Sequence, residues 1–188
     1  MGLHFIKRLG MVTTIGTFAC AALVLSASPA FAGDDHDNDG RGRHGHHDRC
    51  KDVSGKATWT LIPAPNDPLG RVLGPTTGDL KAAVSAYLTS LAPQSDGTLK
   101  AESVETWVLG AQDIIQFAGV ATFTPIANAP IGTVRDALTL TVIGGSGDFA
   151  NATGALQVRG IGYNIFGPGA GPGSSFFEVR YSGQICKD

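Results

Sequence analysis

The chain has 188 residues and a formal net charge of -2 at pH 7, with 43% hydrophobic and 16% charged residues. Because there is no basic surplus, we do not expect it to bind nucleic acid, and its length corresponds to a single domain. The 26 glycines and 10 prolines divide the apolar residues into short runs, which is typical of an all-β domain.

The first 32 residues have the organisation of a secretory signal peptide. Lys7 and Arg8 form a basic n-region, residues 11–25 form an apolar segment, and residues 30–32 read Ala-Phe-Ala, which is typical of a cleavage site. A retained anchor needs about 20 apolar residues, and threonines and glycines interrupt this segment. We therefore predict a secreted or periplasmic protein that has no membrane span after cleavage.

Residues 33–49 read GDDHDNDGRGRHGHHDR and contain no apolar side chain. Such a segment buries too little surface to offset its conformational entropy, so we predict a disordered leader. It contains the four histidines of the mature chain, which are candidate metal ligands: His36, His44, His46 and His47. Imidazole binds Zn, Cu and Ni, but the spacing matches no closed zinc site. A solvated tail with adventitious metal affinity is the alternative interpretation.

No histidine follows His47. This excludes Ser-His-Asp and Cys-His mechanisms, and histidine-built zinc sites, from the remaining 50–188 domain. We predict no cofactor.

Two cysteines, Cys50 and Cys186, lie at opposite ends of the 50–188 domain. In an oxidising compartment an even pair predicts a disulfide. The bond would close almost the whole domain and stabilise it by ~2 to 5 kcal/mol.

Eight segments of this domain are predicted strands, and most of them alternate apolar and polar residues. Residues 79–91 also have apolar residues at helical spacing, but we favour a strand because consecutive strands usually neighbour one another. Four glycines between 144 and 154 predict a tight turn between two long strands. The predicted strands are residues 56–62, 71–73, 79–91, 98–109, 113–124, 134–143, 155–163 and 176–186.

Long antiparallel strands with one apolar face need that face covered, and this chain has no predicted helix to cover it. Closure into an eight-stranded β-barrel buries the apolar face and also removes the sheet edges. The interior of such a barrel is either filled by side chains or holds one small ligand. The candidate interior and ligand-binding residues are Trp59, Trp107, Phe117, Phe123, Phe177 and Tyr181.

Glu105 shares a strand face with Trp107. If this face points inward, loss of water would raise the pKa of Glu105 and make it a candidate general acid or base. The alternative places Glu105 among charged residues on the outside of the barrel.

The segment Gly144-Gly145-Ser146-Gly147-Asp148-Phe149, followed by Ala152 and Gly154, resembles the Gly-Gly-Thr-Gly-x-Phe-x-x-Ala-x-Gly signature of the allene oxide cyclase and dirigent barrel superfamily. The span from about residue 70 to residue 186 is similar to small secreted bacterial proteins classed as allene oxide cyclase barrel-like. Residues 78–80 and 96–99 match two further blocks, Gly-Asp-Leu and Asp-Gly-Thr-Leu. The resemblance implies the barrel and a homotrimer. It implies no particular activity.

Two functions are compatible with these features. The first is a binding barrel that takes a small hydrophobic ligand inside or a protein partner on its outer face. The second is a cofactor-free cyclase or isomerase that holds a lipid- or polyketide-like substrate in a reactive conformation. The small-ligand and cyclase versions both need an interior pocket larger than roughly 300 Å³, and a barrel filled by the aromatic residues would exclude both.

Overall fold

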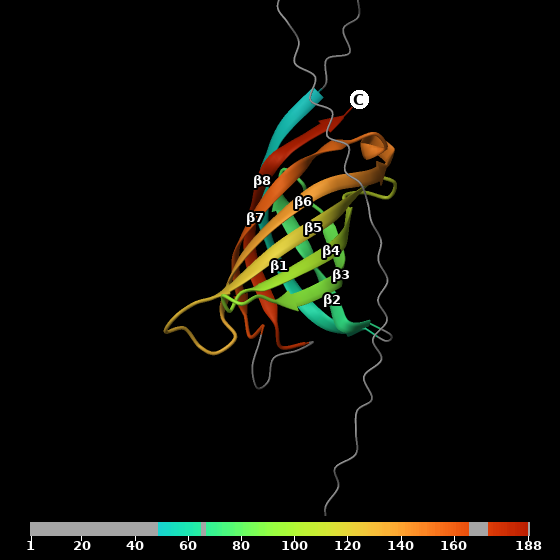
Figure 1. Cartoon of the computed structure of the whole chain (residues 1–188). Helices are drawn as coiled ribbons and strands as arrows, with labels where there is room; N and C mark the ends of the chain where they lie inside the picture. The colour runs from blue at the N-terminus through green and yellow to red at the C-terminus, as the bar shows by residue number, and fades with distance from the viewer. Residues whose placement is uncertain (1–48, 65–66, 166–172, 188) are drawn as a thin grey trace, which may run out of the picture. The chain divides into compact units, whose positions relative to one another are not determined.

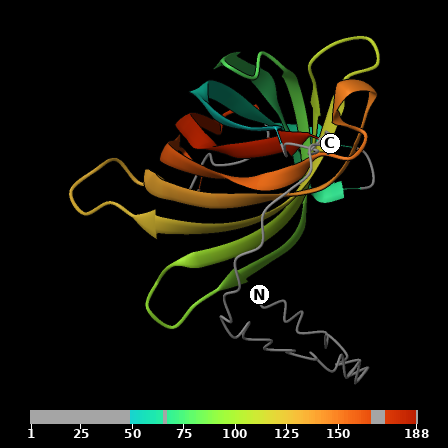
Figure 2. The same ribbon diagram turned by 90° about the horizontal axis from the view of Figure 1, so that it is seen from above.

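The computed structural model describes residues 49–64, 67–165 and 173–187, which form a closed eight-stranded antiparallel barrel (Figures 1 and 2). The strands follow one another around the barrel in chain order, and the last pairs with the first. They are β1 (Arg49–Ala64), β2 (Asp67–Gly78), β3 (Ala83–Pro93), β4 (Leu99–Val108), β5 (Ile114–Pro125), β6 (Val134–Ser146), β7 (Thr153–Tyr163) and β8 (Phe176–Lys187). The predicted all-β barrel is therefore confirmed.

The ambiguous segment at residues 79–91 is a strand from Ala83 onward. The predicted signal peptide, all but the last residue of the predicted leader, and the four candidate metal-binding histidines lie outside the described residues.

Strand β2 is much longer than the predicted segment at residues 71–73. Glycines and two prolines interrupt its hydrophobic alternation, so the pattern alone could not define its ends. Gly74 shows why a small residue is needed. A Cβ there would lie 2.1 Å from the carbonyl oxygen of Thr58 and 3.0 Å from the Cα of Trp59. The close approach of β1 to β2 therefore excludes a side chain at this position.

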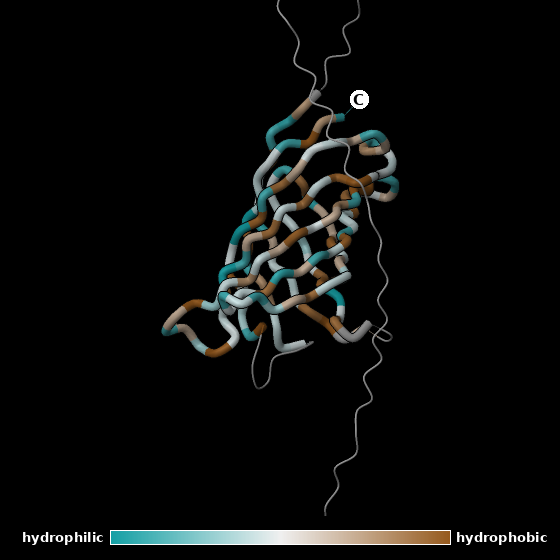
Figure 3. The backbone as a smooth tube through the Cα atoms, viewed as in Figure 1, coloured by the Kyte–Doolittle hydropathy of each residue, from teal (hydrophilic) through white to brown (hydrophobic). Residues whose placement is uncertain are grey.

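The barrel core follows from the two-residue period of the strands. On β8, Phe177, Val179 and Tyr181 are buried, while the intervening Glu178 and Arg180 are exposed. The same alternation is visible along neighbouring strands in the hydropathy colouring (Figure 3). Apolar residues of β8 therefore face the interior, and its polar residues face solvent.

Strands β1 and β8 close the barrel along a seam that runs from Cys50 opposite Cys186 to Thr60 opposite Phe176. A disulfide joins Cys50 and Cys186, as predicted. The bond therefore links directly opposed residues at one end of the seam, with a sequence separation of 136 residues.

One end of the barrel is closed by the connection between β2 and β3. The hydroxyl of Tyr181 donates to the carbonyl oxygen of Thr77 and accepts from the backbone N–H of Leu80, both at 2.9 Å. Gly55 makes room for this contact, because a Cβ there would lie 2.4 Å from the Tyr181 hydroxyl oxygen. The buried Leu80 side chain then covers this end of the core.

The glycine-rich connection between β6 and β7 is shorter than predicted. Gly144 and Gly145 belong to β6, and the chain turns through a short 3-10 helix, η1 (Gly147–Phe149). Gly147 has a φ of 59°, a conformation that favours glycine.

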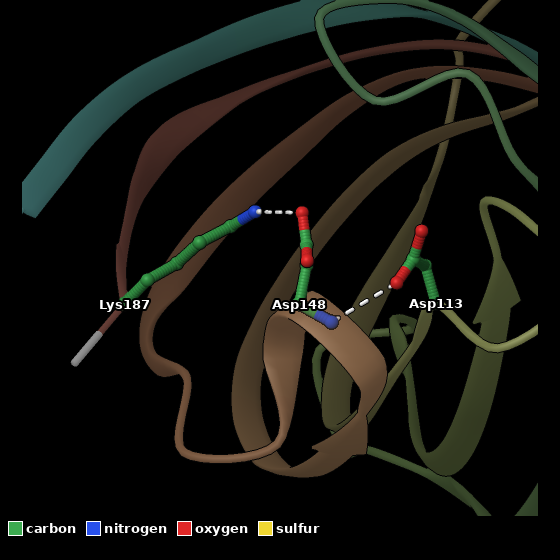
Figure 4. A network of polar contacts seen from close by, with 3 residues as sticks. All are labelled: Asp113, Asp148 and Lys187. Atoms are coloured by element: carbon green, nitrogen blue, oxygen red, sulfur yellow. Dashed lines mark hydrogen bonds and ion pairs between the residues drawn. The ribbon is translucent and has the colours of Figure 1, made fainter.

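The side chain of Asp113 fixes this turn. It accepts a hydrogen bond from the backbone N–H of Asp148 at 3.0 Å, and Lys187 lies 3.7 Å from the Asp148 carboxylate (Figure 4). The turn is thus tied to both the β4–β5 connection and the end of β8.

Candidate ligand cavity inside the barrel

The barrel interior contains a cavity of about 140 Å³, whose lining does not include Tyr181 or the residues to which its hydroxyl is bonded. Its walls are largely apolar, with three polar or acidic side chains, and Leu91 lies at its edge, 38% exposed. The lining residues are Trp59, Leu61, Leu69, Val72, Val84, Ala86, Leu88, Leu91, Ala101, Ser103, Glu105, Ala121, Phe123, Asp136, Leu138, Ile165 and Phe177.

The six aromatic residues that we singled out from the sequence divide between two environments. Trp59, Phe123 and Phe177 line the cavity. Trp107, Phe117 and Tyr181 pack beneath it. The Trp107 ring centroid lies 5.3 Å from that of Phe117 and 5.4 Å from that of Tyr181, in edge-to-face geometry.

The interior is therefore filled by aromatic rings around Trp107 and hollow where Phe123 and Phe177 border the cavity. Trp59 connects the ring cluster to the cavity, because its ring centroid lies 6.3 Å from that of Trp107. A ligand in the cavity would contact the packed aromatic cluster through Trp59.

Glu105 points inward from β4 and is only 3% exposed. Its carboxylate accepts a hydrogen bond from the Trp107 indole N–H at 2.9 Å. Burial raises the pKa of Glu105 to about 7, against the lowering effect of hydrogen bonds from Trp107 and Ser103. The alternative that placed Glu105 on the outer surface is wrong. The structure instead brings an acid that titrates near neutral pH into the cavity wall.

Asp136 is a second buried acid that our sequence analysis did not single out. It points inward from β6, is 3% exposed, and its Oδ1 has no hydrogen-bond partner among the described residues. Burial, followed by the charge of Glu105, raises the pKa of Asp136 to about 7. The signal was present in the sequence, because Asp136 occupies an inward position of the alternation that includes Leu138 and Leu140.

Two further polar groups shape the cavity. The Trp59 indole nitrogen is buried without a hydrogen-bond partner among the described residues. Ser103 lies over Gly119 of the neighbouring strand, where a Cβ would come within 2.2 Å of the serine oxygen. Gly119 therefore leaves room for the Ser103 side chain.

The charge of the cavity is one-sided. Its described lining contains two carboxyl groups and no lysine, arginine or histidine. It can accept hydrogen bonds from a ligand and offer one indole N–H, but it holds no positive charge to pair with an anion. The described residues contain no group of three or more side chains suited to a metal ion.

No family model, curated protein or solved structure matches the chain. Within the described residues, no helix has the length and apolar character needed to cross a membrane.

Proposed function

We propose that the barrel binds a small apolar ligand in its interior cavity. The observation that carries this proposal is a hollow with mostly apolar walls that lies beside a cluster of edge-to-face aromatic rings. Ligand sites are typically concave, apolar and equipped with a few polar groups. The cavity walls have this composition, and their polar groups are Ser103, Glu105 and Asp136.

The cavity volume limits the ligand to about the size of one six-membered ring. At about 140 Å³ it does not reach the roughly 300 Å³ that we set from the sequence for a small ligand or a cyclase substrate, which is the lower limit of pockets for drug-sized ligands. It is close to the ~150 Å³ of an engineered apolar cavity, in another protein, that binds benzene. A lipid- or polyketide-like molecule would need the mouth beside Leu91 to widen.

A titration with ethylbenzene tests the proposal. Trp59 lines the cavity, so binding should change tryptophan fluorescence in a saturable way. Ala101→Leu, which fills the cavity, should abolish the change, and Ala86→Val should weaken it. Ala137→Leu adds the same bulk at an exposed position of β6 and should bind as the unaltered protein does. The absence of saturable binding, or equal binding by Ala101→Leu and Ala137→Leu in folded protein, would overturn the proposal.

Glu105 favours a second candidate function, a cofactor-free isomerase. A carboxyl group in a cavity, with a pKa of about 7, is suited to remove and return a proton at neutral pH. The reaction suited to this cavity is conversion of 3-cyclohexenone to 2-cyclohexenone, in which the base takes the α-proton and returns it to the γ-carbon. Turnover that Glu105→Gln abolishes would support this function. Equal rates with and without protein would eliminate it for this substrate.

We further propose that the protein is an exported member of the allene oxide cyclase and dirigent superfamily and forms a homotrimer. The glycine-rich signature and the closed barrel support membership, and the outward Val120 and Ile143, 57% and 56% exposed, support a subunit contact. Native mass spectrometry of protein from its own host should give three chains, each beginning at Gly33. A monomer would contradict the proposed homotrimer, and a chain that retains Met1 would contradict the proposed export with cleavage.

A further inference from the structure

We propose that the ligand of the interior cavity is a small apolar amine, whose ammonium group is held by Asp136 and Glu105. This inference rests on the proposed function, since it assumes that the cavity binds a ligand. It adds the chemical class of the ligand, and the arrangement of charged and polar groups around the cavity supports it.

The first step is the unpartnered oxygen of Asp136. This side chain is 3% exposed, lines the cavity, and has an Oδ1 without a hydrogen-bond partner among the described residues. A buried polar atom without a partner costs roughly 1–3 kcal/mol. A ligand that donates a hydrogen bond to this oxygen recovers that cost.

The second step is the sign of the charge. Glu105 on β4 and Asp136 on β6 are the ionisable residues of the described cavity lining, and the charge of Glu105 disfavours the ionisation of Asp136. The parts of the wall contributed by β1, β2, β3, β5 and β8 carry no ionisable side chain. A carboxylate or phosphate ligand would therefore add a third negative charge with no cation to pair with it. An ammonium group lowers the energy of both carboxylates.

The third step is the aromatic wall. Trp59, Phe123 and Phe177 line the same cavity, and the ring centroids of Phe123 and Phe177 lie 6.0 Å apart. Aromatic faces attract a desolvated cation as well as an apolar ring. The apolar body of an amine and its charged end therefore both find suitable surfaces in this space.

The inference predicts how affinity changes with pH. The carboxyl groups are protonated below their pKa values of about 7, whereas a benzylic amine stays protonated throughout this range. Binding of the amine therefore strengthens as the pH rises from 5.5 to 8, because only ionised carboxylates form the ion pair. Binding of a hydrocarbon of the same shape does not change through this mechanism.

Three ligands with the same number of non-hydrogen atoms test this prediction: ethylbenzene, benzyl alcohol and benzylamine. Each is titrated into the full-length protein by calorimetry at pH 5.5 and pH 8. At pH 8 benzylamine should bind at least about tenfold more tightly than ethylbenzene, the effect expected of a charge-assisted hydrogen bond. At pH 5.5 this advantage should shrink.

Asp136→Asn keeps the size of the side chain and removes its charge. This variant should lose most of the preference for benzylamine and keep its affinity for ethylbenzene. Asp148→Asn removes a carboxylate whose side chain is 77% exposed and lies outside the cavity lining, so it should keep the preference. The pH comparison on the unaltered protein provides a test that does not depend on any variant folding.

The outcomes separate the two proposals. If no ligand binds, the proposed function fails. If ethylbenzene binds and benzylamine binds no tighter at pH 8, the cavity is a ligand site and the amine inference is wrong. If benzyl alcohol matches benzylamine at both pH values, the cavity recognises a neutral donor, and the inference of a cationic ligand is overturned.

Discussion

The hydroxyl of Tyr181 donates a hydrogen bond to the backbone carbonyl of Thr77 at 2.9 Å, although the two residues are 104 positions apart in the sequence. The same hydroxyl accepts from the backbone N–H of Leu80. Tyr181→Phe removes both bonds and leaves a buried N–H without this partner, so we expect the free energy of unfolding to fall by roughly 1–3 kcal/mol. Urea denaturation measures the change.

Tyr163→Phe is the matched control for this substitution. The Tyr163 hydroxyl makes an exposed contact with Glu178 at 3.5 Å, so its loss should change the free energy of unfolding by less than about 0.5 kcal/mol. Equal effects of the two substitutions would show that Tyr181 does not secure the closed end of the barrel.

The two cavity acids should make the stability depend on pH. Burial raises the pKa values of Glu105 and Asp136 to about 7, so the folded protein holds protons that the unfolded chain has already released. Their contribution to stability is therefore fully present below about pH 4, falls as the pH rises, and levels off above about pH 7.

The double variant Glu105→Gln/Asp136→Asn should lack this decline. Urea midpoints measured between pH 4 and pH 8 compare it with the unaltered protein, and the difference isolates the two carboxyl groups from the rest of the chain. If the urea midpoints of the two proteins changed with pH in the same way, the pKa values of both acids would be the same in the folded and unfolded states.

The disulfide should contribute substantially to stability. Reduction, or Cys50→Ser/Cys186→Ser, releases a constraint on a loop of more than 100 residues, with an expected loss of roughly 2–5 kcal/mol in the free energy of unfolding. Guanidinium denaturation with and without dithiothreitol measures it. Dithiothreitol should have no effect on the double serine variant, and an unchanged midpoint for the reduced protein would contradict the prediction.

The turn at η1 allows a comparison of two carboxylates in one network. Asp113→Ala removes the acceptor of the Asp148 N–H and should cost roughly 1–2 kcal/mol in the free energy of unfolding. Asp148→Asn removes only an exposed ion pair with Lys187 and should cost less than about 1 kcal/mol. Thermal denaturation ranks the two, and the reverse order would show that the ion pair holds the turn.

Much of this fold could be predicted from alternation alone. The inward set on β8, including Phe177 and Tyr181, and the inward direction of Trp59 followed from a period of two residues. The limits of β2 did not, because Gly74 and its neighbouring proline satisfy backbone packing that hydrophobicity does not encode. Gly144 and Gly145 were assigned to a turn, since a pattern of glycines does not distinguish a strand under close backbone contact from a loop.

The candidate site was only partly accessible from the sequence. Glu105 could be singled out because it shares a face with Trp107, but its exposure depended on the direction in which that face pointed. Asp136 occupies an inward position among apolar residues of β6. Its place beside the cavity and its proximity to Glu105 depend on the neighbouring strands, so the sequence of β6 alone does not show them. Which aromatic rings fill the core and which border a cavity depends on the three-dimensional packing of six side chains from four strands, and the order of residues does not specify it.

The pairing of β1 with β8 also sets the order of events during synthesis. The first strand of the barrel emerges from the ribosome long before its partner, so the sheet cannot close, and β1 has no partner on that side, until β8 has been made. A chain that stops just before Phe176 would therefore lack β8 and leave the facing edges of β1 and β7 unpaired. Until this last strand of twelve residues is in place, those edges are available to pair with other chains.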